Sequence, residues 1–373
     1  MRILIVRRKT PLKYGTILII LLSLTIGVAL FTTILAIQGR SPVEVLGTLL
    51  ISFVSPSIVK DFIILTMLGY ALLVSFKGAL WNIGAEGQLF ISTIPVIVLT
   101  LHVMPNPPSQ LHAVTIILLI IIVSTITGAA WASIAGFIRA YLEIDEVPVT
   151  LILNYIAYYV VNILVIGPLK GTRVYGYNRT DEIPSIYRLY VTGLERRFTG
   201  NPAVDTFLGF IYEVIYYLPW LVAMIIIMFT AWYLLNKTQI GLRIRILGSN
   251  PDYLRSVGVN TRLTLVLALT ISGAIVGFTS AFYTLSDLLR LSYPIEGQTA
   301  GYGYLAILVA WLSMLDYKLI PVSAYIVASL RTAGINLQVG GLGGLEQTLL
   351  LIGLILAVYT IVRFLRDYEV RVV

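Results

Sequence analysis

Long apolar runs divide this sequence, and they constrain its fold more than any other feature. Reading for stretches of roughly 20 apolar residues, the length of an α-helix that crosses a bilayer, gives about ten segments. They cover residues 16–37, 62–76, 89–104, 114–138, 147–166, 214–235, 263–285, 304–315, 319–330 and 347–364. The charged fraction is 12%, against roughly 25% in soluble domains. The sequence therefore predicts an all-α, polytopic integral membrane protein in which residues 1–373 form one transmembrane domain.

The distribution of positive charge predicts how these spans are oriented. Basic clusters precede the first span, follow the sixth and follow the tenth, so with an even number of spans all three lie on one side. The positive-inside rule makes that side the cytoplasm. We therefore expect a cell (plasma or inner) membrane protein with both termini in the cytoplasm. Residues 236–262 then form a basic cytoplasmic loop, and residues 167–213 form a long extracytoplasmic loop.

Composition excludes several functional classes. The net charge of +8 follows from the topology and indicates contact with lipid head groups of the membrane, not with nucleic acid. The chain has no cysteine, and its two histidines, His102 and His112, flank an outside turn. Thiolate catalysis, haem binding and zinc peptidase chemistry each lack a required residue within the spans. A Walker lysine motif is also missing from the sequence, so the chain cannot hydrolyse ATP itself, and we expect a transport protein and not an enzyme, with no cofactor bound by this chain.

The segment 76–88 interrupts the apolar pattern with three glycines and the polar residues Asn82, Glu86 and Gln88. Irregular backbone at membrane depth is tolerated only where it is buried in protein or lines a wet cavity. Asn82 and Glu86 are four residues apart, so a helix would place them on one face. The segment either contributes to the path of a solute or forms a cytoplasmic turn with Glu86 solvated beside Lys77.

Two further interruptions precede the eighth and the tenth span. Residues 292–304 mix glycine and tyrosine, and Tyr302 either stacks on a planar base or sugar or anchors the chain at the membrane interface. Residues 340–344 are rich in glycine, which predicts a tight outside turn or a re-entrant bend, with Glu346 capping the helix that follows.

Residues 241–259, in the basic loop, contain a short helix with clear start and stop signals. Asn250 is a favourable N-cap, Pro251 fits the first helical position, and Asp252 complements the positive end of the helix dipole. Gly258 suits a left-handed C-terminal cap. We therefore expect a helix of about seven residues, 251–257, on the membrane surface, where it would be offered to a partner.

Three sequence blocks resemble one family of transporters. Residues 82–88, Asn-Ile-Gly-Ala-Glu-Gly-Gln, resemble the signature of permease subunits of ATP-binding-cassette (ABC) importers for nucleosides and simple sugars. That group belongs to a superfamily with the ribose and branched-chain amino acid permeases. Residues 247–252 resemble its cytoplasmic loop, and residues 301–310 match its third block. Because the order of the blocks and the span count also agree, the resemblance covers nearly the whole chain.

The resemblance implies that residues 251–257 are the coupling helix, which docks into a groove on an ABC ATP-binding subunit. The residues it assigns to coupling are Ser249, Asn250, Pro251, Asp252, Tyr253, Arg255 and Gly258. Those it places in the substrate pathway or its supporting scaffold are Asn82, Glu86, Gln88 and Tyr302. The family usually has two alanines where this chain has Tyr253 and Leu254, which predicts an ATPase adapted to a bulkier face.

The expected mechanism is alternating access. Two permease subunits, as a homodimer or a heterodimer, would enclose the path, while an extracytoplasmic solute-binding protein delivers a nucleoside or simple sugar. A branched-chain amino acid permease of the same superfamily is an alternative. A stand-alone secondary transporter driven by an ion gradient is a second alternative, and it would need intramembrane acids, of which the sequence shows few.

Overall fold

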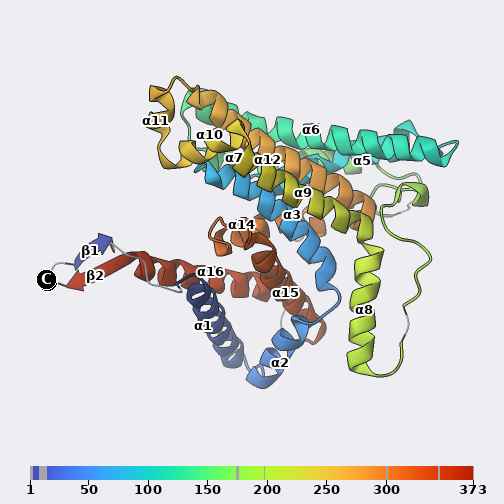
Figure 1. The fold of residues 1–373 in the computed structure, drawn as a ribbon. Coiled ribbons are helices and arrows are strands. Elements are labelled where there is room, and N and C mark those ends of the chain that lie inside the picture. The colour runs from blue at the N-terminus through green and yellow to red at the C-terminus, as the bar shows by residue number, and fades with distance from the viewer. Residues whose placement is uncertain are drawn as a thin grey trace. The chain divides into compact units, whose positions relative to one another are not determined.

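The computed structural model describes residues 3–7, 15–173, 176–196, 198–299, 301–342 and 345–372. The chain divides into two compact units, and each is described by itself. Unit 1 combines Met1–Ile58 with Tyr325–Val373, and unit 2 is Val59–Ala324. Helices account for most of both units (Figure 1), which confirms the predicted fold class.

Unit 1 is built around the first and last long helices. Its elements are α1 (Gly15–Ile37), α2 (Pro42–Ser52), most of α15 (Ile320–Val339) and α16 (Leu345–Asp367). Helices α1 and α16 pack against each other, and the absence of a side chain at Gly27 permits this contact. A Cβ added there would lie only 2.6 Å from Cγ1 of Ile355.

Two short strands join the ends of unit 1. Strand β1 (Ile3–Arg7) pairs antiparallel with β2 (Tyr368–Val372), with Ile3 opposite Val372. The hydropathy pattern did not predict these strands, because they fall outside the long apolar runs. In the same unit, the glycine-rich turn expected at 340–344 is described as far as Leu342. Gly343, Gly344 and the Glu346 side chain lie outside the described part of the chain.

Unit 2 contains the remaining elements. In chain order they are α3 (Ile58–Lys77), α4 (Ala85–Ile91), α5 (Thr93–Ile97), the π-helical η1 (Val98–Val103), α6 (Gln110–Leu142), α7 (Glu146–Ile166), the 3-10 helix η2 (Ser185–Tyr187), α8 (Pro202–Tyr216), α9 (Leu218–Lys237), α10 (Gln239–Ser249), α11 (Pro251–Ser256), α12 (Thr261–Tyr283), the π-helical η3 (Thr284–Leu288), α13 (Glu296–Thr299) and α14 (Tyr302–Leu312).

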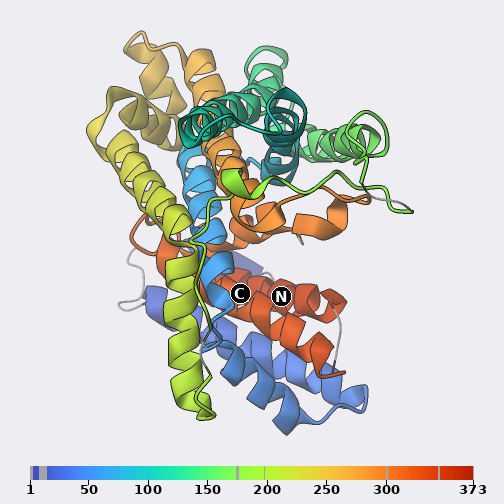
Figure 2. The same cartoon turned by 90° about the vertical axis from the view of Figure 1, so that its right-hand side faces the viewer.

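Helices α6 and α12 form the tightest pair in unit 2, and both views show them running together (Figures 1 and 2). Their backbones meet at glycines. A Cβ on Gly128 would lie 2.4 Å from the carbonyl oxygen of Gly273, and one on Gly277 would lie 2.2 Å from that of Ser124. Close backbone approach at small residues is the usual way in which helices associate in a bilayer.

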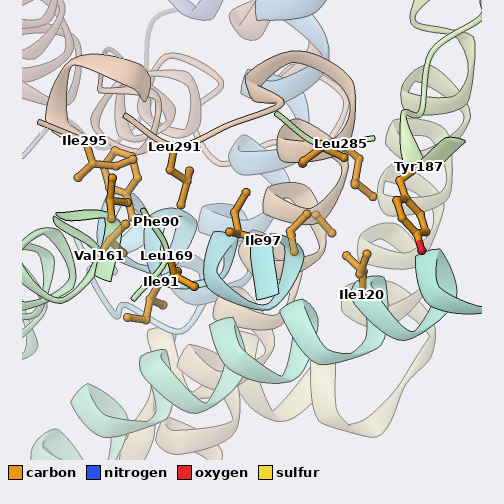
Figure 3. Close-up of a cluster of buried hydrophobic side chains, with 14 of the residues drawn as sticks. Phe90, Ile91, Ile97, Ile120, Val161, Leu169, Tyr187, Leu285, Leu291 and Ile295 are labelled. Carbon is orange, nitrogen blue, oxygen red and sulfur yellow. The ribbon is translucent and has the colours of Figure 1, made fainter. Parts of the chain in front are cut away.

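A cluster of buried apolar side chains lies beside this pair (Figure 3). Residues of α4, α5 and α7 contribute Phe90, Ile97 and Val161, and α6 contributes Ile120. Tyr187 of η2 joins the cluster, and its hydroxyl donates to the carbonyl oxygen of Met104 at 2.6 Å. The segment after α7 is therefore folded against the helices over this stretch.

Within the described residues, seven helical segments are long and apolar enough to cross a membrane. They match the first seven of the expected spans. The last three expected spans fall on α14, α15 and α16, but α14 has only 11 residues and is too short to cross a bilayer. The expected total of about ten spans therefore stays a prediction.

The two expected loops contain helices. Residues 167–213 include η2 and most of α8, which projects from the end of α9 (Figure 2). Asp205 in the first turn of α8 accepts hydrogen bonds from the backbone and hydroxyl of Thr199, and these donors lower the pKa of its carboxyl. The sixth span begins at Leu218 and not at residue 214, because Pro219 suits a first helical turn.

Candidate functional site

The turn between α3 and α4 is fixed by two side-chain amides. Asn82 Nδ2 donates to Gln88 Oε1 at 3.1 Å, and Gln88 Nε2 donates back to Asn82 Oδ1 at 2.8 Å. Asn82 Nδ2 also donates to Ser272 Oγ on α12 at 2.9 Å. Both amides are no more than 1% exposed. Asn82 lies before the start of α4, so the prediction that Asn82 and Glu86 share one face of a helix is wrong. The side-chain partner of Asn82 in this turn is Gln88.

Glu86 binds the start of another helix. Its carboxylate accepts hydrogen bonds from the hydroxyl of Thr299 and from the backbone N–H of Gly303 in the first turn of α14. The negative charge therefore faces the positive end of the α14 dipole. Gly303 is required here, since an added Cβ would lie 2.3 Å from the Glu86 nitrogen. Glu86 is 1% exposed, so the alternative in which it is solvated beside Lys77 is wrong.

Asn154, in the middle of α7, connects α4 to the same region. Its Oδ1 accepts from the N–H of Gly87 at 2.8 Å, and its Nδ2 donates to the carbonyl of Ile83 at 2.9 Å and to the hydroxyl of Tyr304 at 3.2 Å. The sequence interpretation missed this residue. The available signal was an amide inside an otherwise apolar span, which is costly in a membrane unless it has partners.

Tyr302 lies in the interior of unit 2. It is 1% exposed, its hydroxyl donates to the carboxylate of Asp61 on α3, and its ring meets that of Tyr283 edge-on at 5.7 Å. The interpretation of Tyr302 as an anchor at the membrane interface is therefore wrong. In this conformation its ring packs against protein, as part of the attachment of α14 to α3.

Helix α14 begins inside unit 2 and is preceded by the short, separately held helix α13. Asn162, eight residues after Asn154 on α7, donates to the carboxylate of Glu296 at 3.2 Å and accepts from the N–H of Ile295 at 3.0 Å. With 11 residues α14 is about 16 Å long, roughly half the thickness of the hydrocarbon core. The expected break before the eighth span is therefore a real discontinuity.

These contacts form one buried polar network, which we define by Asn82, Glu86, Gln88, Asn154 and Tyr302. It joins α3, α4, α7 and α12 to the start of α14. Amides, a hydroxyl and a carboxylate can hold helices together or hydrogen bond a polar solute. In this conformation their donors and acceptors are used within the protein. This supports the hypothesis that these residues form the scaffold of the path, and it does not support a preformed open binding site.

The predicted surface helix is present as α11. Asn250 Oδ1 accepts from the N–H of Tyr253 at 3.1 Å, Pro251 is the first residue, and Gly258 has the left-handed φ of +76°. The helix ends at Ser256, one residue before the expected end. It follows α10, a helix that the sequence interpretation took as loop and that ends at Ser249.

The outer face of α11 is narrower than predicted. Tyr253 is 53% exposed, whereas Leu254 is 2% exposed and packs inward. Asp252 and Arg255 form an exposed ion pair at 3.2 Å. Leu254 therefore does not belong to the predicted bulky face. The observed outer face consists of Tyr253 between the charged side chains of Asp252 and Arg255.

Helix α10 connects α11 to the turn that contains Asn82. A Cβ on Gly248 would lie 2.3 Å from the carbonyl oxygen of Lys77 and 3.0 Å from the nitrogen of Ala79. Ile244, one turn earlier, is fully buried and lies 3.3 Å from the position of a Cβ on Gly78. The backbone of α10 is therefore in direct contact with the first residues after α3.

Comparison with known proteins finds relatives that match this chain over much of its length. The chain is 26% identical to a guanosine ABC transporter permease protein of Bacillus subtilis over 272 residues, which are 73% of this chain and 70% of the relative. It is 24% identical to a glucose ABC transporter permease protein of Haloferax volcanii over 346 residues, 89% and 84% of the two chains. No solved structure matches the chain.

A third relative, a nucleoside ABC transporter permease protein of Lactococcus lactis, is 30% identical over 223 residues, 59% of this chain and 56% of its own length. The family described as "Branched-chain amino acid transport system / permease component" matches residues 54–359. That match spans most of the chain, including the buried polar network and α11, and the predicted resemblance to ABC permeases is confirmed. The chain therefore belongs to this family of multi-pass permease subunits of ABC transporters.

Proposed function

We propose that this permease subunit imports a nucleoside or a simple sugar across the cell membrane. The substrate class follows from the relatives, whose names specify guanosine, nucleosides and glucose. All of these solutes carry a ring with several hydroxyl groups, which could hydrogen bond to the amides and hydroxyls of the buried polar network once its internal contacts break. A branched-chain amino acid is the second candidate, because the description of the matching family names that substrate.

Permeases of this family work with ATP-binding subunits and a solute-binding protein. We propose that two permease subunits, identical or homologous, enclose the path. In this arrangement both termini and the α10–α11 pair face the cytoplasm, and α8 faces the solute-binding protein on the other side. The positive-inside rule supports this orientation, because the basic residues Arg243, Arg245 and Arg255 lie on α10 and α11.

The observation that carries the mechanism is the contact of Gly248 with the turn after α3. Helix α11 presents Asp252, Tyr253 and Arg255 at the surface, and α10 holds it against Lys77 and Ala79. A few residues later the same turn reaches Asn82, whose amide bonds α4 and α12. A movement of α11 imposed by an ATPase would therefore reach the buried polar network through backbone contacts.

Helix α14 is the element that such a movement would release. It is held at its start by Glu86 and Tyr302, and it is too short to be anchored at both membrane surfaces. Displacement of α4 would pull Glu86 away from Gly303. Alternating access would then consist of making and breaking the attachments at the start of α14 as the ATPases close and open.

The test is uptake by reconstituted complexes. Proteoliposomes that contain this chain, its ATP-binding subunits and its solute-binding protein should accumulate radiolabelled guanosine or glucose when ATP is present. The double variant Asp252→Asn/Arg255→Gln should insert and assemble normally but lose most ATP-driven uptake. Unchanged uptake by that variant would contradict the coupling role of α11. Uptake of leucine alone would replace the proposed substrate class, and ATP-independent uptake by the permease alone would contradict the importer proposal.

A further inference from the structure

A polar cavity of about 620 Å³ lies at the end of α6, beside α11 and the first turn of α12. Its lining includes three arginines that come from three different helices, Arg139 on α6, Arg255 on α11 and Arg262 on α12. Glu143 and Thr261 complete the polar part of the lining. The cavity belongs neither to the buried polar network nor to the proposed path.

The surroundings of the cavity place it at the boundary between lipid and water. Helices α6 and α12 are both long and apolar enough to cross a bilayer, and the cavity lies where one ends and the other begins. Large apolar side chains next to it are exposed, namely Phe137, Tyr141, Leu142 and Leu263. Exposed aromatic and aliphatic side chains next to arginines are typical of the headgroup level of a membrane.

The arginines are held in place and still have donors to offer. Arg139 pairs with Glu146 at 3.1 Å, and Arg255 pairs with Asp252 at 3.2 Å. Arg262 stacks over the ring of Tyr141, with its guanidinium carbon 5.7 Å from the ring centre. A guanidinium carries five N–H donors, so one carboxylate or one ring leaves several of them available. Arg262 and Thr261 also lie at the positive end of the α12 dipole.

We propose that this cavity binds the phosphodiester of a membrane phospholipid headgroup. Arginine is the side chain best suited to bind phosphate oxygens in pairs, and basic pockets between membrane helices bind lipid headgroups. Glu143 lines the same cavity and repels a second negative charge. This favours a phosphodiester, which carries a single negative charge, over free phosphate, which is partly doubly charged at neutral pH. The exposed side chains of Phe137 and Tyr141 lie where the acyl chains would begin.

The proposal goes beyond transport, because it requires only that α6 and α12 span a bilayer. It has a consequence for coupling, however. Arg255 belongs to α11, so a bound headgroup would connect the coupling helix to α6 and α12 through the lipid. The position of α11, and hence its fit to an ATPase, would depend on the occupancy of this cavity.

The experiment measures retained lipid on the intact chain. The full-length permease, reconstituted with phosphatidylglycerol and re-extracted in mild detergent, is examined by native mass spectrometry. We expect one tightly retained phosphatidylglycerol molecule, and about fivefold weaker retention in Arg262→Gln, as expected for the loss of one cation near a headgroup. Arg262→Lys should recover part of the affinity. Arg243→Gln, on the exposed face of α10, makes the same change of charge outside the cavity and should retain lipid like the wild type.

Several outcomes would overturn the proposal. Equal losses in Arg262→Gln and Arg243→Gln would show that only the overall charge attracts lipid. Displacement of the lipid by millimolar inorganic phosphate would assign the cavity to a free anion. Unchanged lipid retention in Arg262→Gln, together with loss of its assembly with ATP-binding subunits, would assign the cavity to the protein partner. Correct folding of each variant is checked by its thermal unfolding in the same detergent.

Discussion

At the scale of single residues, Glu86 is a buried carboxylate in unit 2 and needs local partners. A carboxylate that is 1% exposed must have its negative charge compensated locally, because burial of an unpaired charge costs several kcal/mol. The hydroxyl of Thr299, the N–H of Gly303 and the α14 dipole supply this compensation. The motif that suggested the family therefore contains a residue that holds one helix to the start of another.

Replacing Glu86 by Gln tests this attachment. The amide keeps the size of the side chain but removes the charge and turns one acceptor into a donor, so Thr299 or Gly303 loses its partner. We expect a loss of about 1–3 kcal/mol in stability, the cost of leaving a buried polar group unsatisfied, and reduced uptake. Thermal unfolding in detergent measures the first effect. Glu195→Gln, on an exposed loop residue, is the matched control and should leave the transition where it is.

Gly248 allows a prediction about coupling and not about stability, because its backbone connects α10 to the turn after α3. In Gly248→Ala the new methyl group would collide with the carbonyl of Lys77, so α10 must move away from the turn after α3. We expect several-fold lower ATP-driven uptake with the ATPase subunits still bound. Gly47→Ala on α2 has open space around its Cβ and should be neutral or slightly stabilising. Equal uptake by both variants would rule out the α10 contact as the route of coupling.

At the scale of the elements, α11 places one residue at the surface and the next one in the interior: Tyr253 is exposed and Leu254 is buried. Tyr253→Ala should weaken binding of the ATP-binding subunits, measured by co-purification, and should leave the unfolding temperature of the isolated chain unchanged. Leu254→Ala should lower the unfolding temperature and leave the binding surface intact. It removes a buried side chain, which costs roughly 2–5 kcal/mol in a well-packed site. If both variants lost the partner without loss of stability, Leu254 would belong to the surface that contacts the ATPase.

The sequence predicted local features better than contacts between distant ones. Capping rules identified α11 because Asn250, Pro251 and Gly258 act within one helix, where sequence distance and spatial distance agree. Hydropathy located most of the long helices for the same reason, although several of their ends differ from the predicted ends by a full helical turn or more. Glu86 was predicted as a polar residue at membrane depth, but its partners Thr299 and Gly303 are more than 200 positions away. Single-sequence patterns contain no information about such pairs.

Helix α10 was missed for a different reason. Its arginines made residues 236–262 look like a solvated loop. The buried residues Gly241, Ile244 and Leu247 are spaced by three, however, and this spacing fits one face of a helix. The sequence also did not predict that α14 is too short to cross the bilayer. Residues 304–315 are apolar, and a helix that stops halfway has the same apolar composition as one that crosses. Hydropathy reports the environment of a segment, and it does not report the depth at which the segment begins.

At the scale of the whole molecule, the proposed orientation can be tested with single cysteines, because the natural sequence contains none. Ser256→Cys on α11 and Ala203→Cys on α8 are both exposed positions. A maleimide reagent that does not cross membranes should label Ala203→Cys in intact cells and label Ser256→Cys only after the cells are opened. The reverse pattern would place α11 outside and would exclude its contact with an ATPase in the cytoplasm.

The glycine contacts between α6 and α12 also set a limit on how this chain can change over evolutionary time. A residue inserted within either helix would turn everything beyond it by about 100°. A side chain would then replace Gly128, Gly273 or Gly277 at the point where the two backbones touch. Substitutions elsewhere on these helices can accumulate, but changes in length cannot. Differences in length among relatives should therefore be confined to segments between helices, such as the one between α7 and α8, while each of these glycines keeps its position within its own helix.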